Sequence, residues 1–148
     1  MTVTISALGE REFFAWYSLL AEYAASNDVT LSDEHVMRVF TAVQAPGSFG
    51  LVAHDEGGSV VGLVHVRRVE RLLTEEAAYE VEDLFVSQDA RRQGVATALI
   101  EHVRTRAESD GLGRLRWVAK QDDPAAKALQ EKFAASAGGW VLQSLPVA

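Results

Sequence analysis

Cysteine is absent from this 148-residue chain, which excludes disulfides, thiolate zinc sites and cysteine nucleophiles and is compatible with the reducing cytosol. Long apolar runs are missing too, because none approaches the roughly 18 residues of a membrane-spanning helix. The N-terminal stretch MTVTISALGEREF has neither the basic region nor the long apolar region of a secretory signal. The sequence therefore predicts a soluble cytoplasmic protein.

Positive charge is also scarce. Lys and Arg number 14 against 21 Asp and Glu, so the formal net charge is -7 at pH 7. A surface that binds nucleic acid or an anionic membrane needs a basic excess over the whole chain or over one face. We therefore expect neither partner, although a local basic spot can still bind a single anion.

Several familiar active-site motifs are missing. The chain has no G-x-x-x-x-G-K-[ST], no G-x-G-x-x-G and no G-x-S-x-G, so it lacks the P-loop, the Rossmann fingerprint and the usual hydrolase elbow. Its four histidines are scattered. If the EGG turn closes a tight hairpin, His54 lies opposite about Val61 and His65 opposite about Gly50, so the two do not pair as ligands. We expect no metal site.

What is present indicates one α/β domain over residues 1–148. Hydrophobic residues make up 48% of the chain, with no repeat or linker to divide it. The pattern predicts elements in the order β-α-α-β-β-β-α-β-α-β, an antiparallel meander passing into a β-α-β crossover, with helices on the faces of a mixed sheet. The strands are expected at 2–8, 48–55, 59–69, 77–86, 114–120 and 140–147. The first helix is expected at 13–24, the second begins after an N-cap at Ser32, the third runs from 95 to about 111, and the fourth spans 124–137.

The segment RRQGVATALIEHV, residues 91–103, places two arginines and a glycine at the start of a helix. A helix N-terminus exposes unsatisfied N–H groups and carries the positive end of the dipole, so it binds anions when they can approach the backbone. Gly94 permits that approach, and Arg91 and Arg92 add groups that bind phosphate oxygens. The alternative is that Gly94 only starts the helix and the arginines are solvated.

The stretch Arg91-Arg92-Gln93-Gly94-Val95-Ala96 resembles the [QR]-x-x-G-x-[GA] acetyl-coenzyme A signature of the GCN5-related N-acetyltransferase (GNAT) family. It lies in the matching place, after VEDLFV and before TALIEHV, and WVAKQDDPAAKAL follows downstream. The resemblance extends over essentially the whole chain. It implies a mixed sheet of six to seven strands that splays between the fourth and fifth. VEDLFV is similar to the branch that acts on diamines, polyamines and other small amines.

The resemblance also implies a cosubstrate and the residues that bind it. Acetyl-CoA is the expected acetyl donor, and transfer is direct to a primary amine, expected to be a small cationic molecule. The pantetheine arm pairs with the end of the preceding strand and the pyrophosphate binds the turn that opens the helix. The implied coenzyme residues are Leu84, Phe85, Val86, Arg91, Arg92, Gln93, Gly94, Val95, Ala96 and Thr97, with Asp123 and Lys127 from the penultimate helix.

Glu82 is the expected catalytic residue. An aliphatic amine with a pKa near 10.4 is only about 0.04% neutral at pH 7, so a carboxylate near the splay can act as base through water or anchor the cation. Glu82 occupies the glutamate position of the family's L-E-D-x-F/Y-V segment. Strand alternation puts it on the face of Glu80 and opposite Asp83. The alternative is an exposed strand residue that balances Arg67 or Arg68.

The chain departs from the family pattern in the penultimate helix. Relatives often carry N-x-x-A-x-x-L-Y there, whose tyrosine protonates the leaving thiolate, whereas this chain has Asp123 and Gln130, or Asp122 and Leu129 in the other register. Tyr79 or a tyrosine of the first helix is the expected substitute. Two alternatives stay open: an acetyl-CoA-binding sensor or interaction module without efficient catalysis, and an N-acetyltransferase of proteins or peptides. The expected last strand leaves a homodimer open as well.

Overall fold

The computed structural model describes residues 2–136, 138 and 141–147. The chain forms two compact units, Met1–Val118 and Ala119–Ala148, and each is described by itself. The first unit contains β1 (Thr4–Ala7), α1 (Phe13–Ser26), α2 (Asp33–Gln44), β2 (Ser48–His54), β3 (Val60–Arg71), β4 (Glu76–Val86), α3 (Val95–Ser109) and β5 (Arg114–Trp117), with short 3-10 helices at Glu10–Glu12 and Gln88–Ala90. In the second unit, α4 spans Pro124–Lys132.

The five strands form one mixed sheet in the order β1-β2-β3-β4-β5. Neighbours from β1 to β4 are antiparallel, and β4 and β5 are parallel, as the α3 crossover between them requires. This confirms the predicted meander followed by a β-α-β unit. His65 faces Gly50 as expected, and His54 faces Val60 because Val61 is an extra residue in β3.

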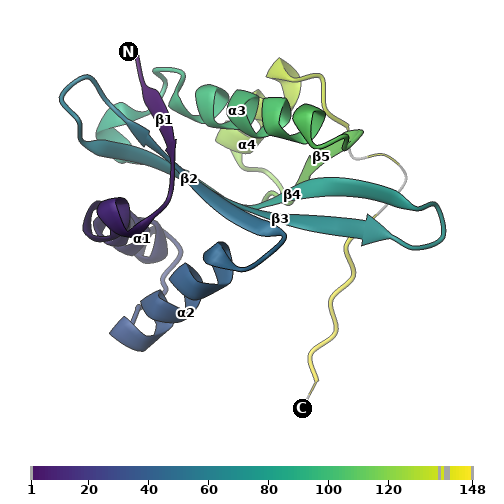
Figure 1. Ribbon diagram of the computed structural model, residues 1–148, viewed down its shortest axis with the longest axis horizontal. Helices are drawn as coiled ribbons and strands as arrows, with labels where there is room; N and C mark the ends of the chain where they lie inside the picture. Colours follow the sequence, from purple (N-terminus) through teal and green to yellow (C-terminus); the bar gives the residue numbers. More distant parts are fainter. Residues whose placement is uncertain (1, 137, 139–140, 148) are drawn as a thin grey trace. The chain divides into compact units, whose positions relative to one another are not determined.

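Helices cover both faces of the sheet (Figure 1). On the face of α1 and α2, the buried core consists of Leu8, Trp16, Leu19, Leu20, Val36, Val43, Val52, Leu63 and Phe85. On the other face, α3 buries Val95, Leu99, Ile100, Val103 and Ala107. Ser32 caps α2 as predicted, with its hydroxyl oxygen accepting from the His35 N–H at 3.1 Å. None of the helices among the described residues is long and apolar enough to span a membrane.

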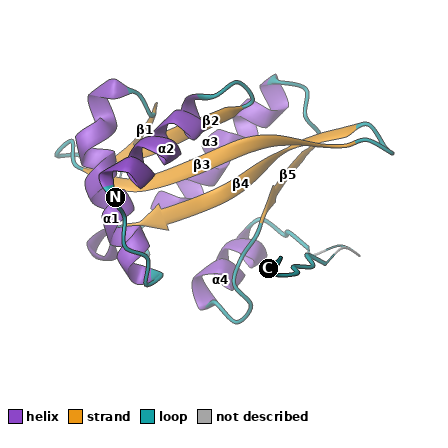
Figure 2. Cartoon of the chain, turned by 90° about the horizontal axis from the view of Figure 1, so that it is seen from below, coloured by secondary structure: helices purple, strands orange, loops and turns teal. Residues whose placement is uncertain are grey.

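The pairing of β4 with β5 is short. It runs only from Ala78 opposite Arg114 to Val81 opposite Trp117, whereas β4 continues to Val86. Strand β5 ends at Trp117, so none of its residues lies beside the remainder of β4 (Figure 2). The predicted splay between the fourth and fifth strands is therefore confirmed, and it leaves one edge of β4 without a strand neighbour in the described part of the chain.

The predicted strand over 140–147 is wrong for the residues described. Residues 141–147 form neither strand nor helix, and Trp140 lies outside the described residues. The sheet accordingly has five strands instead of six to seven. The apolar side chains in this segment, Val141, Leu142, Leu145 and Val147, are all largely exposed. Residues with strand propensity form a stable strand only when a neighbouring strand pairs with them and buries their side chains, because this offsets the conformational entropy that is lost. The periodicity of a single segment does not show whether such a neighbour is present.

Gly62 lets α3 pack closely on β3. A Cβ atom there would lie 2.8 Å from Cγ1 of Val95 and 3.1 Å from Cδ1 of Leu99, both buried. We therefore expect Gly62→Ala to lower the free energy of unfolding by about 1 to 3 kcal/mol through overpacking, measured by urea denaturation. Gly113→Ala is the matched control, because a Cβ atom at Gly113 meets nothing within 4 Å. Equal stability of the two variants would contradict this account of the packing.

Candidate active site

A β-bulge in β4 shapes the centre of the sheet. His65 of β3 faces Asp83, but the next residue, Val66, faces Val81, so Glu82 is an extra residue with no partner in the register. The expectation that Glu82 and Asp83 point to opposite faces is therefore wrong. Strict alternation fails at the bulge, and both carboxylates line one pocket. Beyond it Phe85 packs into the core on the side of α1 and α2.

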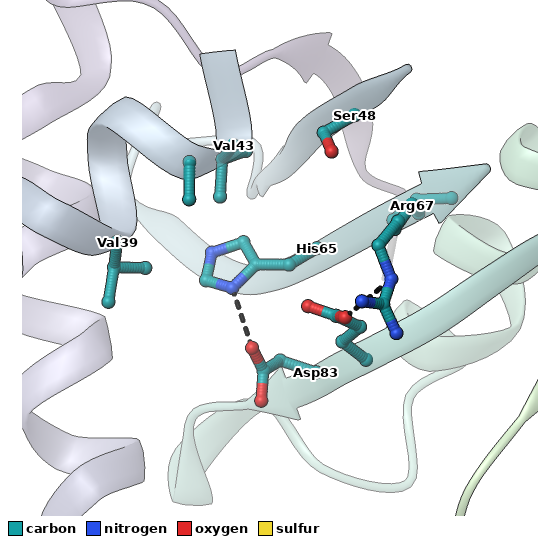
Figure 3. Close-up of a pocket in the computed structure, with 9 residues that line it drawn as sticks. Val39, Val43, Ser48, His65, Arg67 and Asp83 are labelled. Carbon is teal, nitrogen blue, oxygen red and sulfur yellow. Dashed lines mark hydrogen bonds and ion pairs between the residues drawn. The ribbon is translucent and has the colours of Figure 1, made fainter. Parts of the chain in front are cut away.

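This pocket has a volume of about 280 Å³ and lies on the side of the sheet that carries α2 (Figure 3). Helix α2 supplies apolar side chains, and the strands supply the polar ones. The lining consists of Val39, Ala42, Val43, Ser48, His65, Val66, Arg67, Glu82 and Asp83. Small-molecule sites combine apolar walls with a few convergent polar groups in this way, and the volume is at the lower end of their range.

A hydrogen-bonded network runs behind the pocket from α1 to β4. The Trp16 indole N–H donates to Nε2 of His65 at 3.0 Å, and His65 Nδ1 lies 2.9 Å from Oδ2 of Asp83. The hydroxyl of Tyr23 donates to the other oxygen, Oδ1 of Asp83, at 3.0 Å. His65 is only 2% exposed, so this network satisfies a polar side chain inside the protein.

The network shifts the pKa values of Asp83 and Tyr23 in opposite directions. Burial raises the pKa of Asp83, but its hydrogen-bonding and electrostatic contact with His65 and the hydrogen bond from Tyr23 lower it by more, so the net pKa lies below its ordinary value. Burial and the neighbouring carboxylate of Asp83 raise the pKa of Tyr23 well above that of a free phenol. At neutral pH, Asp83 is therefore a carboxylate and Tyr23 a neutral donor.

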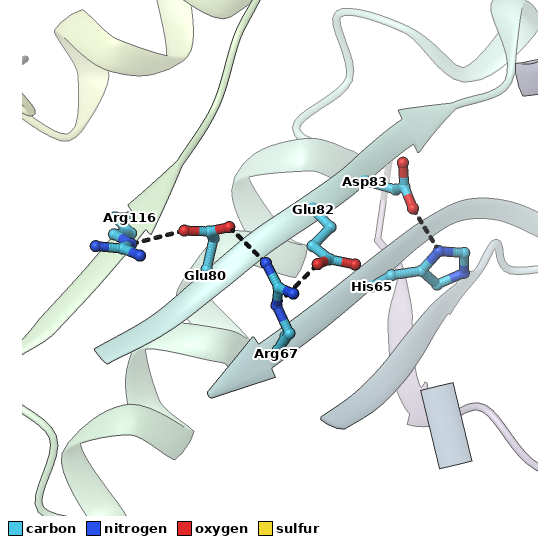
Figure 4. A network of polar contacts seen from close by, with 6 residues as sticks. All are labelled: His65, Arg67, Glu80, Glu82, Asp83 and Arg116. Atoms are coloured by element: carbon cyan, nitrogen blue, oxygen red, sulfur yellow. Dashed lines mark hydrogen bonds and ion pairs between the residues drawn. The ribbon is translucent and has the colours of Figure 1, made fainter. Parts of the chain in front are cut away.

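Next to this network, a chain of ion pairs crosses the same face of the sheet (Figure 4). Arg67 contacts Glu82 at 2.9 Å through Nε and Glu80 at 3.2 Å through a terminal nitrogen. Glu80 also pairs with Arg116 of β5 at 2.7 Å. Glu82 thus balances Arg67, as one of the two sequence interpretations expected. Its side chain remains 43% exposed and also lines the pocket.

The turn before α3 has the backbone geometry that an anion site needs. Gly94 is the N-cap residue with φ 84° in the left-handed region, and no side chain caps the helix. Arg92, two residues earlier, also has a positive φ of 60°. A Cβ atom at Gly94 would meet no protein atom within 4 Å, so the space over the first turn is open. Uncapped N–H groups that face open space can receive phosphate oxygens.

The remaining predicted side chains of this turn are already engaged locally. Arg91 donates through Nε to the carbonyl of Val86 at 3.2 Å, and its guanidinium carbon lies 5.5 Å from the centroid of the Phe85 ring. Gln93 donates to the carbonyl of Asp89 at 3.2 Å. Val95 is buried against the sheet, whereas Ala96 and Thr97 are partly exposed in the first turn of α3.

The end of β4 offers backbone groups to the open edge. The N–H of Ser87 donates to the carbonyl of Val61 in β3 at 2.9 Å. Backbone groups of successive strand residues point to alternate sides, so those of Phe85 point toward β3 and those of Leu84 and Val86 point away from it. Leu84 and the N–H of Val86 therefore present hydrogen-bonding groups along this edge, whereas the Val86 carbonyl already accepts from Arg91. An extended ligand can add to the edge like a short strand.

The model of the acetyltransferase (GNAT) family matches residues 13–134. The chain belongs to the GNAT family. It is therefore an acetyltransferase, as the resemblance of residues 91–96 predicted, and GNAT enzymes use acetyl-CoA as the acetyl donor.

Individual members of the family are only distantly similar to this chain in sequence. The D-amino-acid N-acetyltransferase HPA3 of Saccharomyces cerevisiae is 29% identical over 136 residues, which covers 89% of this chain and 84% of the relative. The ribosomal-protein-alanine N-acetyltransferase from Brucella melitensis biovar Abortus 2308 is 25% identical with a TM-score of 0.79, covering 99% of this chain and 100% of the other. AAC(6')-Iy, solved with a CoA-containing bisubstrate analog, has a TM-score of 0.85 over the full length of both chains. At 14% identity this likeness shows the fold alone.

The second unit of the GNAT chain contains the position where relatives often have a tyrosine. Asp123 caps α4, its carboxylate accepting from the N–H of Ala125 at 3.0 Å. Lys127 and Gln130 are exposed on the same helix. Within the first unit, Tyr79 donates to Asp110 at the end of α3. It does not line the pocket, and its role as a substitute acid stays a prediction.

Sequence reasoning missed the network of Trp16, His65 and Tyr23. His65 was considered only as a metal ligand, and no pattern in the sequence links a tryptophan and a tyrosine of α1 to residues more than 40 positions away. Among the described residues, no group of three or more His, Asp or Glu side chains is placed to bind a metal ion.

Proposed function

We propose that this GNAT chain transfers an acetyl group from acetyl-CoA directly to the primary amine of a small cationic molecule. The observation that carries the proposal is the pocket at the bulge of β4, where two carboxylates meet beside the open edge of the same strand. This arrangement brings an acidic acceptor pocket next to backbone groups suited to the donor. We also propose that both units belong to one acetyltransferase domain, because the family match runs from α1 through α4.

The described residues fit acetyl-CoA as the donor. The uncapped first turn of α3 at Gly94 would hold the pyrophosphate, and the open edge at Leu84 and Val86 would hold the pantetheine arm. When bound, acetyl-CoA supplies a thioester whose carbonyl carbon is open to attack by an amine. Arg92, Asp123 and Lys127 stay proposed as further coenzyme residues.

Glu82 is the proposed base. Making the neutral amine at pH 7 costs about 4.6 kcal/mol for a group of pKa 10.4, so a carboxylate that takes the proton through water lowers the barrier. The neutral amine nitrogen then forms its bond to the carbonyl carbon as the carbon–sulfur bond breaks, and the proton that the acylated nitrogen loses passes to the released thiolate, so the products are the amide and the coenzyme A thiol. The thiol leaves as a thiolate, which its pKa near 8.5 makes tolerable without a tyrosine acid.

Charge around the pocket supports a cationic acceptor more weakly than the sequence suggested. Glu80, Glu82 and Asp83 carry three negative charges on this face, and Arg67 and Arg116 return two positive ones through the ion pairs. The surplus is a single negative charge. Because an exposed field of this kind is screened by salt, it raises the local concentration of a cation only at low ionic strength.

A peptide acceptor is the second candidate function. The observation that favours it is the 25% identity with a ribosomal-protein-alanine N-acetyltransferase over nearly the whole chain. The small volume of the pocket favours a small molecule instead, because a peptide needs an open groove for several residues.

The testing experiment combines binding and turnover. Thermal-shift measurements with acetyl-CoA should show stabilisation, and thiol release should then be followed with polyamines, amino acids, aminoglycosides and peptides. We expect turnover with a small primary amine and a Michaelis constant for that amine that rises with ionic strength while turnover at saturation changes little. Coenzyme binding without thiol release on the whole panel would favour the sensor alternative. Turnover with peptides alone would favour the second candidate.

A further inference from the structure

The hydrogen bonds of the buried network determine the charge of His65. An indole nitrogen is only a donor, so the contact from Trp16 requires Nε2 of His65 to be an unprotonated acceptor. The single ring proton then resides on Nδ1, where it is donated to Asp83 at 2.9 Å. His65 is therefore neutral. A second proton on Nε2 would place two buried N–H donors against each other, which costs the hydrogen bond and leaves both unsatisfied.

A neutral His65 leaves the negative charge of Asp83 without a positive partner. Its two oxygens accept from His65 and Tyr23, and both donors are uncharged. In the part of the chain that the structure describes, no lysine or arginine forms an ion pair with Asp83, whereas Glu80 and Glu82 both pair with Arg67. About a third of the Asp83 side chain is exposed, at 33%, and it lines the pocket.

We propose that Asp83 is the carboxylate that binds an ammonium group of the acceptor, and that Trp16, acting through His65, keeps this charge available. The inference rests on the proposed function, because it names the residue that selects the acceptor in the same pocket. A carboxylate that is partly buried and has no cationic partner gains most from a ligand ammonium, since the attraction is stronger away from bulk water. Glu80 and Glu82 gain less because Arg67 and Arg116 together already neutralise them.

Trp16 and His65 are positioning residues in this scheme. The Trp16 indole of α1 faces the His65 ring. Figure 3 shows the other groups at the ring, which are the Asp83 carboxylate of β4 and the apolar Val39 and Val43 of α2 in the pocket wall. Only Asp83 among them titrates. If the donor from Trp16 were removed, Nε2 could take a proton, and the resulting imidazolium would pair with Asp83 and compete with the acceptor.

The first test is Asp83→Asn, which removes the charge and keeps the shape. The amide oxygen can still accept from His65, and the amide N–H₂ can donate to the Tyr23 oxygen, so the network stays satisfied. For the best amine of the panel, we expect the Michaelis constant to rise by about 10- to 100-fold, because a hydrogen bond between charged groups is lost. Turnover at saturating amine and the Michaelis constant for acetyl-CoA should change by less than about threefold, because Asp83 is not the base.

Asp33→Asn is the matched control. Asp33 also accepts from a tyrosine of α1, with the Tyr17 hydroxyl 2.8 Å from its oxygen, but it does not line the pocket. The substitution removes the same charge, and we expect an unchanged Michaelis constant. An equal rise in both variants would show that only net charge matters and would overturn the role of Asp83. An unchanged constant in Asp83→Asn would overturn it as well while acetyl transfer to amines stands.

The second test is spectroscopic. The ring ¹⁵N signals of His65 should show the neutral form with its proton on Nδ1 at neutral pH. In Trp16→Phe the same signals should report protonation as the pH falls, and the Michaelis constant for the amine should rise with it. Trp16 lies in the core, so that variant can fail to fold. The spectrum of the parent protein tests the inference without this variant, because a doubly protonated His65 at neutral pH overturns the inference.

Failure of the inference and failure of the proposed function give different results. If no amine is acetylated, 1,4-diaminobutane is added to the parent protein and to Asp83→Asn, and the His65 signals are followed. Shifts in the parent that are lost in the variant support the ammonium site even though the proposed transfer fails. Absence of shifts in the parent overturns the inference.

Discussion

Replacing Gly94 by phenylalanine is expected to weaken acetyl-CoA binding by about 10- to 1,000-fold, which corresponds to one or two lost hydrogen bonds to charged groups. The ring would occupy the open space above the first turn of α3, where a Cβ atom meets no protein atom within 4 Å. The N–H groups of that turn would no longer be reached by the pyrophosphate. Isothermal titration with acetyl-CoA measures the loss.

The fold should survive this substitution, because the left-handed φ of 84° costs a non-glycine residue only about 1 to 2 kcal/mol. Gly111→Phe is the matched control. Gly111 has a φ of 73°, equally open surroundings, and a place at the other end of the same helix. The control should bind acetyl-CoA like the parent. If Gly94→Phe also binds normally, the coenzyme site lies elsewhere.

Glu82→Gln is expected to lower turnover at pH 7 by about 100-fold, the low end of what a general base contributes. Part of the loss should be recovered as the pH rises toward the pKa of the amine near 10.4, because the neutral nucleophile then forms without help. Steady-state thiol release across this pH range measures both effects. Gln130→Ala should change turnover little, since α4 has no tyrosine at the position of the usual acid.

The ion pair with Arg67 provides the control for the role of Glu82. If Glu82 only holds Arg67 in place, at 2.9 Å, then Arg67→Gln breaks the same contact and should reproduce the loss of turnover. If Glu82 is the base, Arg67→Gln leaves the carboxylate in the pocket and retains most of the activity. A silent Glu82→Gln together with an inactive Gln130→Ala would reverse the assignment.

Much of the fold was predictable because its elements are specified locally. Ser32 caps α2 through its own hydroxyl, and Gly94 starts α3 because only a residue tolerant of positive φ suits that turn. The turn between β2 and β3 fixed their register to within one residue, so that His65 faces Gly50. In each of these places the residues that determine the structure are close together in the sequence.

Predictions failed where a distant partner decides the outcome. The segment 141–147 has the apolar residues of a strand, but strand formation depends on an edge to pair with, and the described residues of the segment form none. The hydrogen bond of Tyr79 likewise depends on a distant partner, because the packing of α3 brings Asp110 to its hydroxyl. Periodicity gives the face of a residue only as long as the alternation is unbroken.

The sequence by itself determined the family, the mixed α/β fold, the helix start at Gly94 and the acidic residues of β4, because these follow from motifs and local periodicity. Only the tertiary structure decided which carboxylate carries an uncompensated charge. The bulge at Glu82 turns Asp83 into the pocket, and α1 brings Trp16 and Tyr23 to His65 and Asp83. The physical reason is that the charge state of a buried group depends on donors that are distant in sequence and meet only when the chain folds.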